Sequence, residues 1–120
     1  MNTQEVAQKL VQFCREGRNI DAINELYADN VVSLEQPGTP MERAEGKEAV
    51  LAKNNYWYES VEAVHSVVIS DPIVTGDFFA VTMEMDVTYK NSGRMKMQEI
   101  AVYRVKDGKI ITDQFHYSME

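Results

Sequence analysis

The chain has 120 residues with 19 acidic and 12 basic side chains, which gives a formal net charge of −7. This length fits one domain over residues 1–120, and 44% apolar with 26% charged residues is typical of a globular protein. The negative charge repels nucleic acid, and no apolar run is long enough to span a membrane. The single cysteine, Cys14, allows no internal disulfide, so we expect a reducing, cytoplasmic setting.

Three helices are predicted in the first half of the chain. The first is capped by Thr3 and stops at Gly17, the second begins at Asn19 and ends at Ala28–Asn30, and the third runs from about Gly46 to about Ser60. The apolar stripe of the first helix contains Val6, Leu10 and Phe13. The β-branched run Val31–Glu35 predicts a short strand, and Thr39–Glu45 is expected to be a loop.

The second half of the chain predicts antiparallel strands joined by tight turns. Their expected ranges are Glu62–Ser70, Ile73–Thr75, Phe78–Tyr89, Met95–Val105 and Ile110–Tyr117. Alternation along the long third strand places Met83 and Met85 on one face. The three-residue loop Asn91–Gly93 then keeps Met97 and Glu99 on that same face. Helices placed ahead of an antiparallel sheet are typical of an α+β fold, in which the helices cover one face of the sheet.

Three carboxylates fall on faces that otherwise look buried. Glu99 lies between two apolar residues of the inward row, Asp113 lies on the inward face of the last strand, and Glu35 ends the first short strand. An unpaired buried carboxylate is costly, so this pattern predicts a cavity whose acids act as catalytic acid or base. The alternative is structural. Glu99 could instead form a buried ion pair with Lys53, and Asp113 could lie at a sheet margin in water.

The rest of the predicted cavity is apolar. Lys53 and Asn54 flank the buried stripe of the third helix and would orient or polarise a ligand. The predicted walls are Trp57, Met83, Met85, Tyr103, Phe115 and Phe13. The methionines could equally be adaptable core filler. Two histidines and one cysteine show no metal-ligand spacing, and no glycine-rich loop for phosphate is present, so we expect neither a metal nor a cofactor.

Three segments carry a resemblance to a known family. They are LYADNVVSLEQPG (Leu26–Gly38), GKEAVLAKNNYWYE (Gly46–Glu59) and YRVKDGKIITDQFHY (Tyr103–Tyr117). Through them nearly the whole chain resembles the SnoaL-like polyketide cyclases of the nuclear-transport-factor-2-like superfamily, which also contains ketosteroid isomerase. The resemblance implies three helices packed on a strongly curved antiparallel sheet, a cone-shaped α+β barrel with an apolar pocket open at one end. It also implies a homodimer formed through the outer face of the sheet.

The catalytic residues of ketosteroid isomerase do not carry over to this chain. The hydrogen-bonding tyrosine of its first helix falls on Phe13, its aspartate before a proline falls on Gln36, and its second donor falls on Ala101. The resemblance therefore implies the fold and the pocket but not steroid isomerisation.

Three functions remain open from the sequence. The leading hypothesis is a pocket for a small apolar molecule, in which Glu99 or Asp113 exchanges protons with a carbonyl-bearing ligand. The second is a non-enzymatic dimeric module that binds a ligand or a protein and uses the outer sheet face, where Ile100 and Val102 lie among polar residues. The third is a domain whose pocket is filled by its own side chains. Fold analogy alone does not choose between them.

Overall fold

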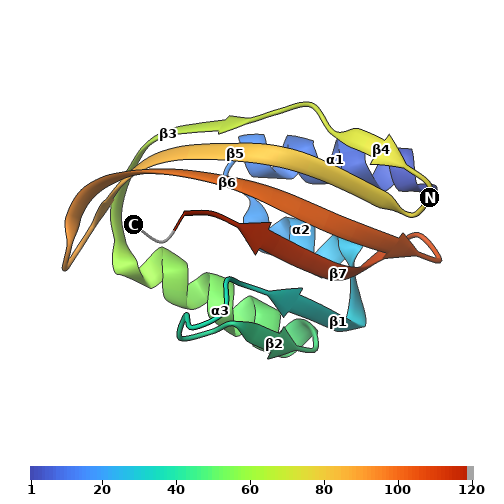
Figure 1. Cartoon of the computed structure of the whole chain (residues 1–120), viewed down its shortest axis with the longest axis horizontal. Coiled ribbons are helices and arrows are strands. Elements are labelled where there is room, and N and C mark those ends of the chain that lie inside the picture. Colours follow the sequence, from blue (N-terminus) through green and yellow to red (C-terminus); the bar gives the residue numbers. More distant parts are fainter. Residues whose placement is uncertain (119–120) are drawn as a thin grey trace.

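The computed structural model describes residues 1–118 and contains three helices and a seven-stranded sheet (Figure 1). In chain order the elements are α1 (Thr3–Arg15), α2 (Asn19–Leu26), β1 (Tyr27–Leu34), β2 (Arg43–Glu45), α3 (Lys47–Ser60), β3 (Val61–Ile69), β4 (Ile73–Thr75), β5 (Phe78–Tyr89), β6 (Gly93–Lys106) and β7 (Lys109–His116). The predicted α+β class is confirmed. No helix within these residues is both long and apolar enough to cross a membrane.

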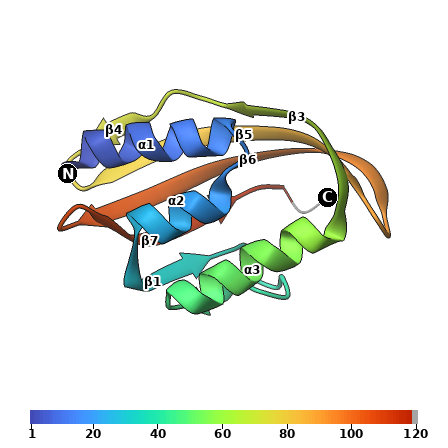
Figure 2. The ribbon, with the colours of Figure 1, turned by 180° about the vertical axis from the view of Figure 1, so that it is seen from behind.

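The strands form one curved sheet in the order β2-β1-β7-β6-β5-β3, with β4 paired to β5. Strand β1 runs parallel to β7, and the other pairs are antiparallel. The long strands β5 and β6 bend across the molecule in Figure 1. Seen from behind, all three helices lie on the same side of the sheet, and α3 leads directly into β3 (Figure 2). A layer of helices therefore covers the concave face.

The first helix begins one residue earlier than the sequence suggested. Asn2, not Thr3, is its N-cap, because the Asn2 side chain accepts a hydrogen bond from the backbone N–H of Glu5 while the Glu5 carboxylate accepts one from the backbone N–H of Asn2. This reciprocal capping box satisfies two of the backbone donors that a helix start leaves free. The helix buries Val6 and Leu10 as predicted.

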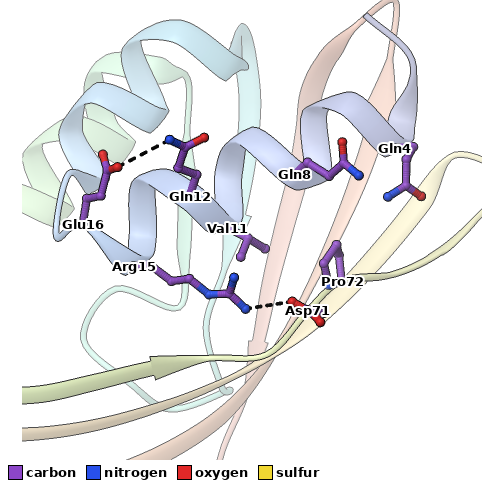
Figure 3. A pocket seen from close by; sticks show the side chains of 8 residues that line it. All are labelled: Gln4, Gln8, Val11, Gln12, Arg15, Glu16, Asp71 and Pro72. Carbon is purple, nitrogen blue, oxygen red and sulfur yellow. Dashed lines mark hydrogen bonds and ion pairs between the residues drawn. The ribbon is translucent and has the colours of Figure 1, made fainter.

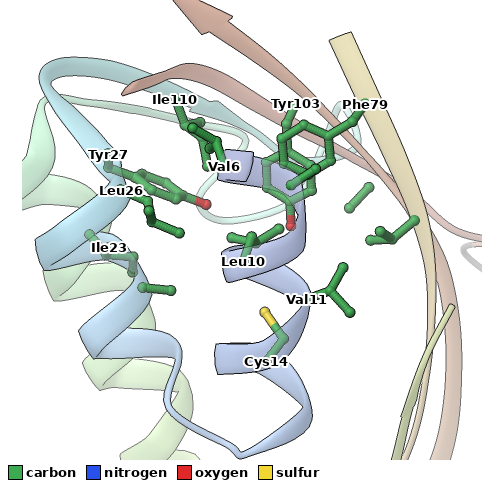
Figure 4. Close-up of a cluster of buried hydrophobic side chains, with 14 of the residues drawn as sticks. Val6, Leu10, Val11, Cys14, Ile23, Leu26, Tyr27, Phe79, Tyr103 and Ile110 are labelled. Carbon is green, nitrogen blue, oxygen red and sulfur yellow. The ribbon is translucent and has the colours of Figure 1, made fainter. Parts of the chain in front are cut away.

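The core lies between α1, α2 and the central strands (Figure 4). Leu10 of α1 and Ile110 of β7 are almost fully buried within it. The rings of Phe79 and Tyr103, from neighbouring strands β5 and β6, stack with their centroids 4.6 Å apart. Burying each side chain of this size contributes about 2 kcal/mol to the stability of the fold. This core holds in place the strands and helices that carry the polar groups of the site.

The loop between β5 and β6 has three residues, as predicted, but it spans 90–92 and so lies one residue earlier than the expected Asn91–Gly93; its odd length still keeps the predicted side chains on one face. Tyr89 pairs with Gly93, whose φ of 82° is the left-handed conformation that glycine tolerates. The register places Met83 opposite Glu99. The predicted inward row of methionines and Glu99 is therefore confirmed.

One strand starts earlier than predicted, and one strand was not predicted. Strand β1 begins at Tyr27 rather than Val31, because Tyr27 already pairs with Ile110 of β7. The segment predicted as a loop contains β2, which pairs with the second half of β1. In both cases a partner strand distant in the sequence overrides a weak local signal.

A bulge between β6 and β7 shifts the side-chain alternation near the start of the last strand. Arg104 pairs with Thr112, but Val105 pairs with Ile110. Ile110 therefore takes the fully buried position, and Ile111, which strict alternation places on the inward face, is only half-buried. The extra residue is the usual consequence of a bulge.

Candidate functional site

A cavity of about 510 Å³ lies between the helices and the concave face of the sheet. Its walls include all five of the predicted polar groups, which are Glu35, Lys53, Asn54, Glu99 and Asp113. They also include five of the six predicted apolar groups, which are Trp57, Met83, Met85, Tyr103 and Phe115. A volume of this size is typical of sites for small molecules.

Phe13 is the predicted wall residue that does not line the cavity. It is half-buried against the core, and the Arg18 guanidinium lies 4.9 Å from its ring centroid. Its position on α1 turns it toward the helix end, whereas Leu10 and Cys14 of the same helix do line the cavity. Burial raises the pKa of the Cys14 thiol to about 12, so this wall group is neutral.

Lys53 of α3 is the centre of a polar cluster. Its Nζ lies 2.7 Å from Glu35 Oε2 and donates a hydrogen bond of 2.8 Å to Ser33 Oγ. The Tyr117 hydroxyl donates to Glu35 Oε1 at 2.9 Å. The Lys53 and Glu35 side chains are only 14% and 18% exposed. The lysine is therefore held in one place, and its ion pair is with Glu35 rather than with Glu99.

Asp113 is buried at the inner end of the same cluster, with only 2% of its surface exposed, so it does not lie at a sheet margin in water. Its Oδ2 accepts a hydrogen bond of 2.5 Å from the Tyr27 hydroxyl, and its Oδ1 is buried without a hydrogen-bond partner among residues 1–118. Burial raises the pKa of Asp113, and the hydroxyls of Ser33 and Tyr27 oppose that rise. An unmatched buried oxygen of this kind costs about 1–3 kcal/mol.

Glu99 stands apart from the ion pair. It is half-buried on β6 opposite Met83, and its carboxyl makes no hydrogen bond within the described residues. Burial is the main cause that raises the pKa of Glu99 from 4.5 to about 7. Repulsion from Glu35 and Asp113 adds to this rise in pKa, and attraction to Lys53 opposes it. Glu99 is therefore a carboxyl group that can both gain and lose a proton near neutral pH.

The aromatic wall is fixed by its own hydrogen bonds. The Trp57 indole N–H donates to the Tyr89 hydroxyl at 3.1 Å, and that hydroxyl donates to the sulfur of Met97 at 2.9 Å. The side-chain amide of Asn54 donates to the Val50 carbonyl of its own helix, so that N–H is not available to a ligand in this conformation.

Three site residues were not predicted from the sequence, namely Ser33, Tyr27 and Tyr117. Alternation places Ser33 on the same face of its strand as Glu35, and this pattern could have identified Ser33 as a site residue. Tyr117 shares its parity with Asp113 and Phe115 and could have been found in the same way. Tyr27 looks like the end of an apolar helical stripe, and nothing local indicates that its hydroxyl meets Asp113.

A second hollow of about 660 Å³ lies on the surface between α1 and the connection from β3 to β4 (Figure 3). Most of its side chains are exposed and polar, as Gln4 and Gln8 are. Arg15 crosses it to donate to the Ile69 carbonyl at 2.8 Å and to Asp71 at 2.9 Å. This hollow contains no buried carboxylate, so the cavity with Glu99 and Asp113 is the better candidate site.

Comparison with known proteins supports the same fold and family. A SnoaL-like protein from Mesorhizobium loti, whose name proposes a polyketide cyclase, is 37% identical, with 98% of this chain and 100% of that chain covered and a TM-score of 0.92. A nuclear-transport-factor-2-like protein of unknown function from Burkholderia pseudomallei is 16% identical, with 98% and 92% covered and a TM-score of 0.80. A Catenulispora acidiphila protein with a ketosteroid isomerase-like fold, in complex with trimethylamine, is 19% identical, with 98% and 88% covered and a TM-score of 0.76.

At 16% and 19% identity, the last two likenesses show the fold alone. No curated protein matches the chain. The family model described as a SnoaL-like domain matches residues 1–117, almost the whole chain. The chain therefore belongs to the SnoaL-like domain family.

Proposed function

We propose that the protein binds a small apolar carbonyl compound in its cavity and exchanges protons with it through Glu99. The proposal depends on the position and the raised pKa of the Glu99 carboxyl. This carboxyl lies on the wall of a largely apolar cavity, makes no hydrogen bond within residues 1–118, and has its pKa raised to about 7. A general base works best when its pKa is close to the working pH, and this group meets that condition.

The charges around Glu99 suit the removal of a proton next to a carbonyl. When the Glu99 carboxylate accepts that proton, the C–H bond breaks and its electron pair moves to the carbonyl oxygen as an enolate. Lys53 is the cationic residue of the described walls, and its charge, which acts on Glu99 through space and without a hydrogen bond, favours the negatively charged enolate at a distance. Return of the proton to another carbon would isomerise the ligand, and attack by the enolate on a second carbonyl would close a ring.

The test uses β-tetralone, a bicyclic ketone that has acidic α-protons and is small enough for the cavity. Exchange of these protons for deuterium is followed by nuclear magnetic resonance in heavy water. We expect the protein to accelerate exchange, with a rate that rises with pH through about 7 as Glu99 loses its proton. Glu99→Gln should remove the acceleration, and Glu84→Gln, which changes an exposed carboxylate on the outer face, should not. Equal rates for wild type and Glu99→Gln would refute the role of Glu99.

A second proposal concerns the outer face of the sheet, which has exposed apolar side chains on four strands. Val68, Ile73, Phe78 and Ile100 are 56%, 76%, 45% and 49% exposed, and their register partners on β5 and β6 place them on the side away from the helices. Apolar side chains gathered on one face favour association, and we propose a homodimer formed through this face. Sedimentation should show a dimer for wild type and a monomer for Ile100→Asp. A wild-type monomer at high concentration would refute it.

A further inference from the structure

We propose that the ligand has a hydroxyl group at the end opposite its reacting carbonyl, and that this hydroxyl binds between Lys53 and Asp113. This inference rests on the proposed function, since it identifies the class of compound on which Glu99 acts. It comes from the way in which the polar groups are distributed along the cavity.

The cavity has two polar ends, which we call the Asp113 station (Asp113 and Lys53) and the Glu99 station (Glu99). An apolar stretch of the wall separates them. Asp113 pairs with Tyr103 of β6, and Glu99 lies four residues before Tyr103 on the same strand and on the same face. At ~3.3 Å per residue this places the two backbone positions about 13 Å apart along the strand. Ala101 and Phe115, which pair with each other, lie between them. A ligand that reaches both stations therefore has an apolar middle.

The station at Asp113 has one unused acceptor. Tyr27 satisfies Oδ2, whereas Oδ1 is buried, belongs to the cavity wall and has no hydrogen-bond partner among residues 1–118. The Ser33 hydroxyl is near enough to lower the pKa of Asp113, but Oδ1 has no hydrogen bond of normal geometry within residues 1–118. Buried polar atoms are nearly always paired, so such an atom on a cavity wall points to a donor that is supplied from outside the chain. Occupation by a ligand O–H would satisfy it.

The same station has one unused donor. An ammonium group has three N–H donors, and Lys53 directs two of them at Ser33 and Glu35. Ser33 is the register partner of Asp113 on the neighbouring parallel strand, so the lysine reaches the Asp113 end of the cavity. Its third N–H is available to an acceptor there.

A hydroxyl is the smallest uncharged group of a ligand that meets both requirements. A carbonyl accepts from Lys53 but leaves Oδ1 unmatched, and an ammonium donates to Oδ1 but is repelled by Lys53. A hydroxyl accepts a hydrogen bond and donates one, so it can bridge Lys53 Nζ and Asp113 Oδ1. The ligand class is thus an apolar hydroxyketone, with the hydroxyl at the Asp113 station and the carbonyl near Glu99.

The test compares three ring-substituted forms of β-tetralone by calorimetry. One has a hydroxyl on the aromatic ring, one has a methoxy group at the same position, and one has hydrogen. The methoxy oxygen accepts but cannot donate, so it isolates the contact with Asp113. We expect the hydroxyl form to bind about tenfold more tightly than the methoxy form, in line with a hydrogen bond to a charged group.

Asp113→Asn should bring the ratio of these two affinities close to one, and Asp29→Asn, which changes a fully exposed carboxylate, should leave it unchanged. If Asp113→Asn does not fold, Lys53→Met serves as the second variant and should remove the preference for the hydroxyl form over the unsubstituted ketone. Equal or weaker binding of the hydroxyl form in wild type would overturn the inference. If β-tetralone still exchanges its protons through Glu99 in that case, the proposed function stands and only the inference about the ligand hydroxyl is lost. If β-tetralone neither binds nor exchanges, the proposed function fails as well.

Discussion

The raised pKa of Glu99 predicts a measurable effect on stability. Because the folded protein binds this proton more tightly than the unfolded chain does, the carboxyl stabilises the fold only while it is protonated. This contribution is fully present below about pH 4.5, decreases as the pH rises, and is lost above about pH 7. Glu99→Gln keeps the neutral shape at every pH. The variant should therefore equal wild type in mildly acidic solution and be more stable than wild type in alkaline solution.

The magnitude follows from the size of the pKa change. A rise from 4.5 to about 7, at ~1.4 kcal/mol for each pKa unit, corresponds to ~3 kcal/mol in the free energy of unfolding. Urea denaturation followed by circular dichroism across this pH range would measure the difference between variant and wild type. Glu84→Gln serves as the control, because that carboxylate is exposed and its removal should leave the pH dependence unchanged. A constant difference between Glu99→Gln and wild type at all pH values would refute the reasoning.

Three further substitutions test other contacts. Tyr27→Phe removes the hydroxyl that donates to Asp113. It should lower the free energy of unfolding by ~1–3 kcal/mol, as measured by urea denaturation. It should also raise the pKa of Asp113 further, as measured by carbon-detected magnetic resonance. Lys53→Met removes the one attractive charge on Glu99, so the pKa of Glu99 should move above about 7 in the same experiment; a fall in this pKa would contradict the electrostatic account. Asn2→Ala removes the helix cap and should lower stability by ~1 kcal/mol, visible as a lower thermal midpoint.

The features that the sequence predicted well are those set by local rules. Strict alternation and an odd loop length were enough to place Met83 and Glu99 on one face, because a three-residue loop keeps the same parity on both strands. The exact position of the loop was missed by one residue, so the pairing of Met83 with Glu99 was not predicted. The early start of β1 at Tyr27 was missed for the opposite reason, since its signal lies in β7, far along the chain. The pairing of Tyr27 with Asp113 is likewise a tertiary contact that no local pattern encodes.

In the candidate site, too, local patterns could be predicted from the sequence and tertiary contacts could not. Inward carboxylates could be recognised because they interrupt an apolar row, and this identified Glu35, Glu99 and Asp113 as groups of one cavity. Which of them Lys53 neutralises depends on the angle at which α3 crosses the sheet, and the sequence pattern contains no information on that angle. Phe13 was placed on the wall because its helical stripe is broad, and the structure turns it toward Arg18 instead.

The parallel pairing of β1 with β7 has a consequence for the order of folding. Tyr27 and Asp113 are 86 positions apart, so the contact between them closes most of the chain into a loop, and such distant contacts form slowly. The helices and the β5–β6 hairpin can assemble from near neighbours beforehand. The polar end of the cavity would then be completed in the final docking step, and refolding experiments should recover ligand binding later than helical content.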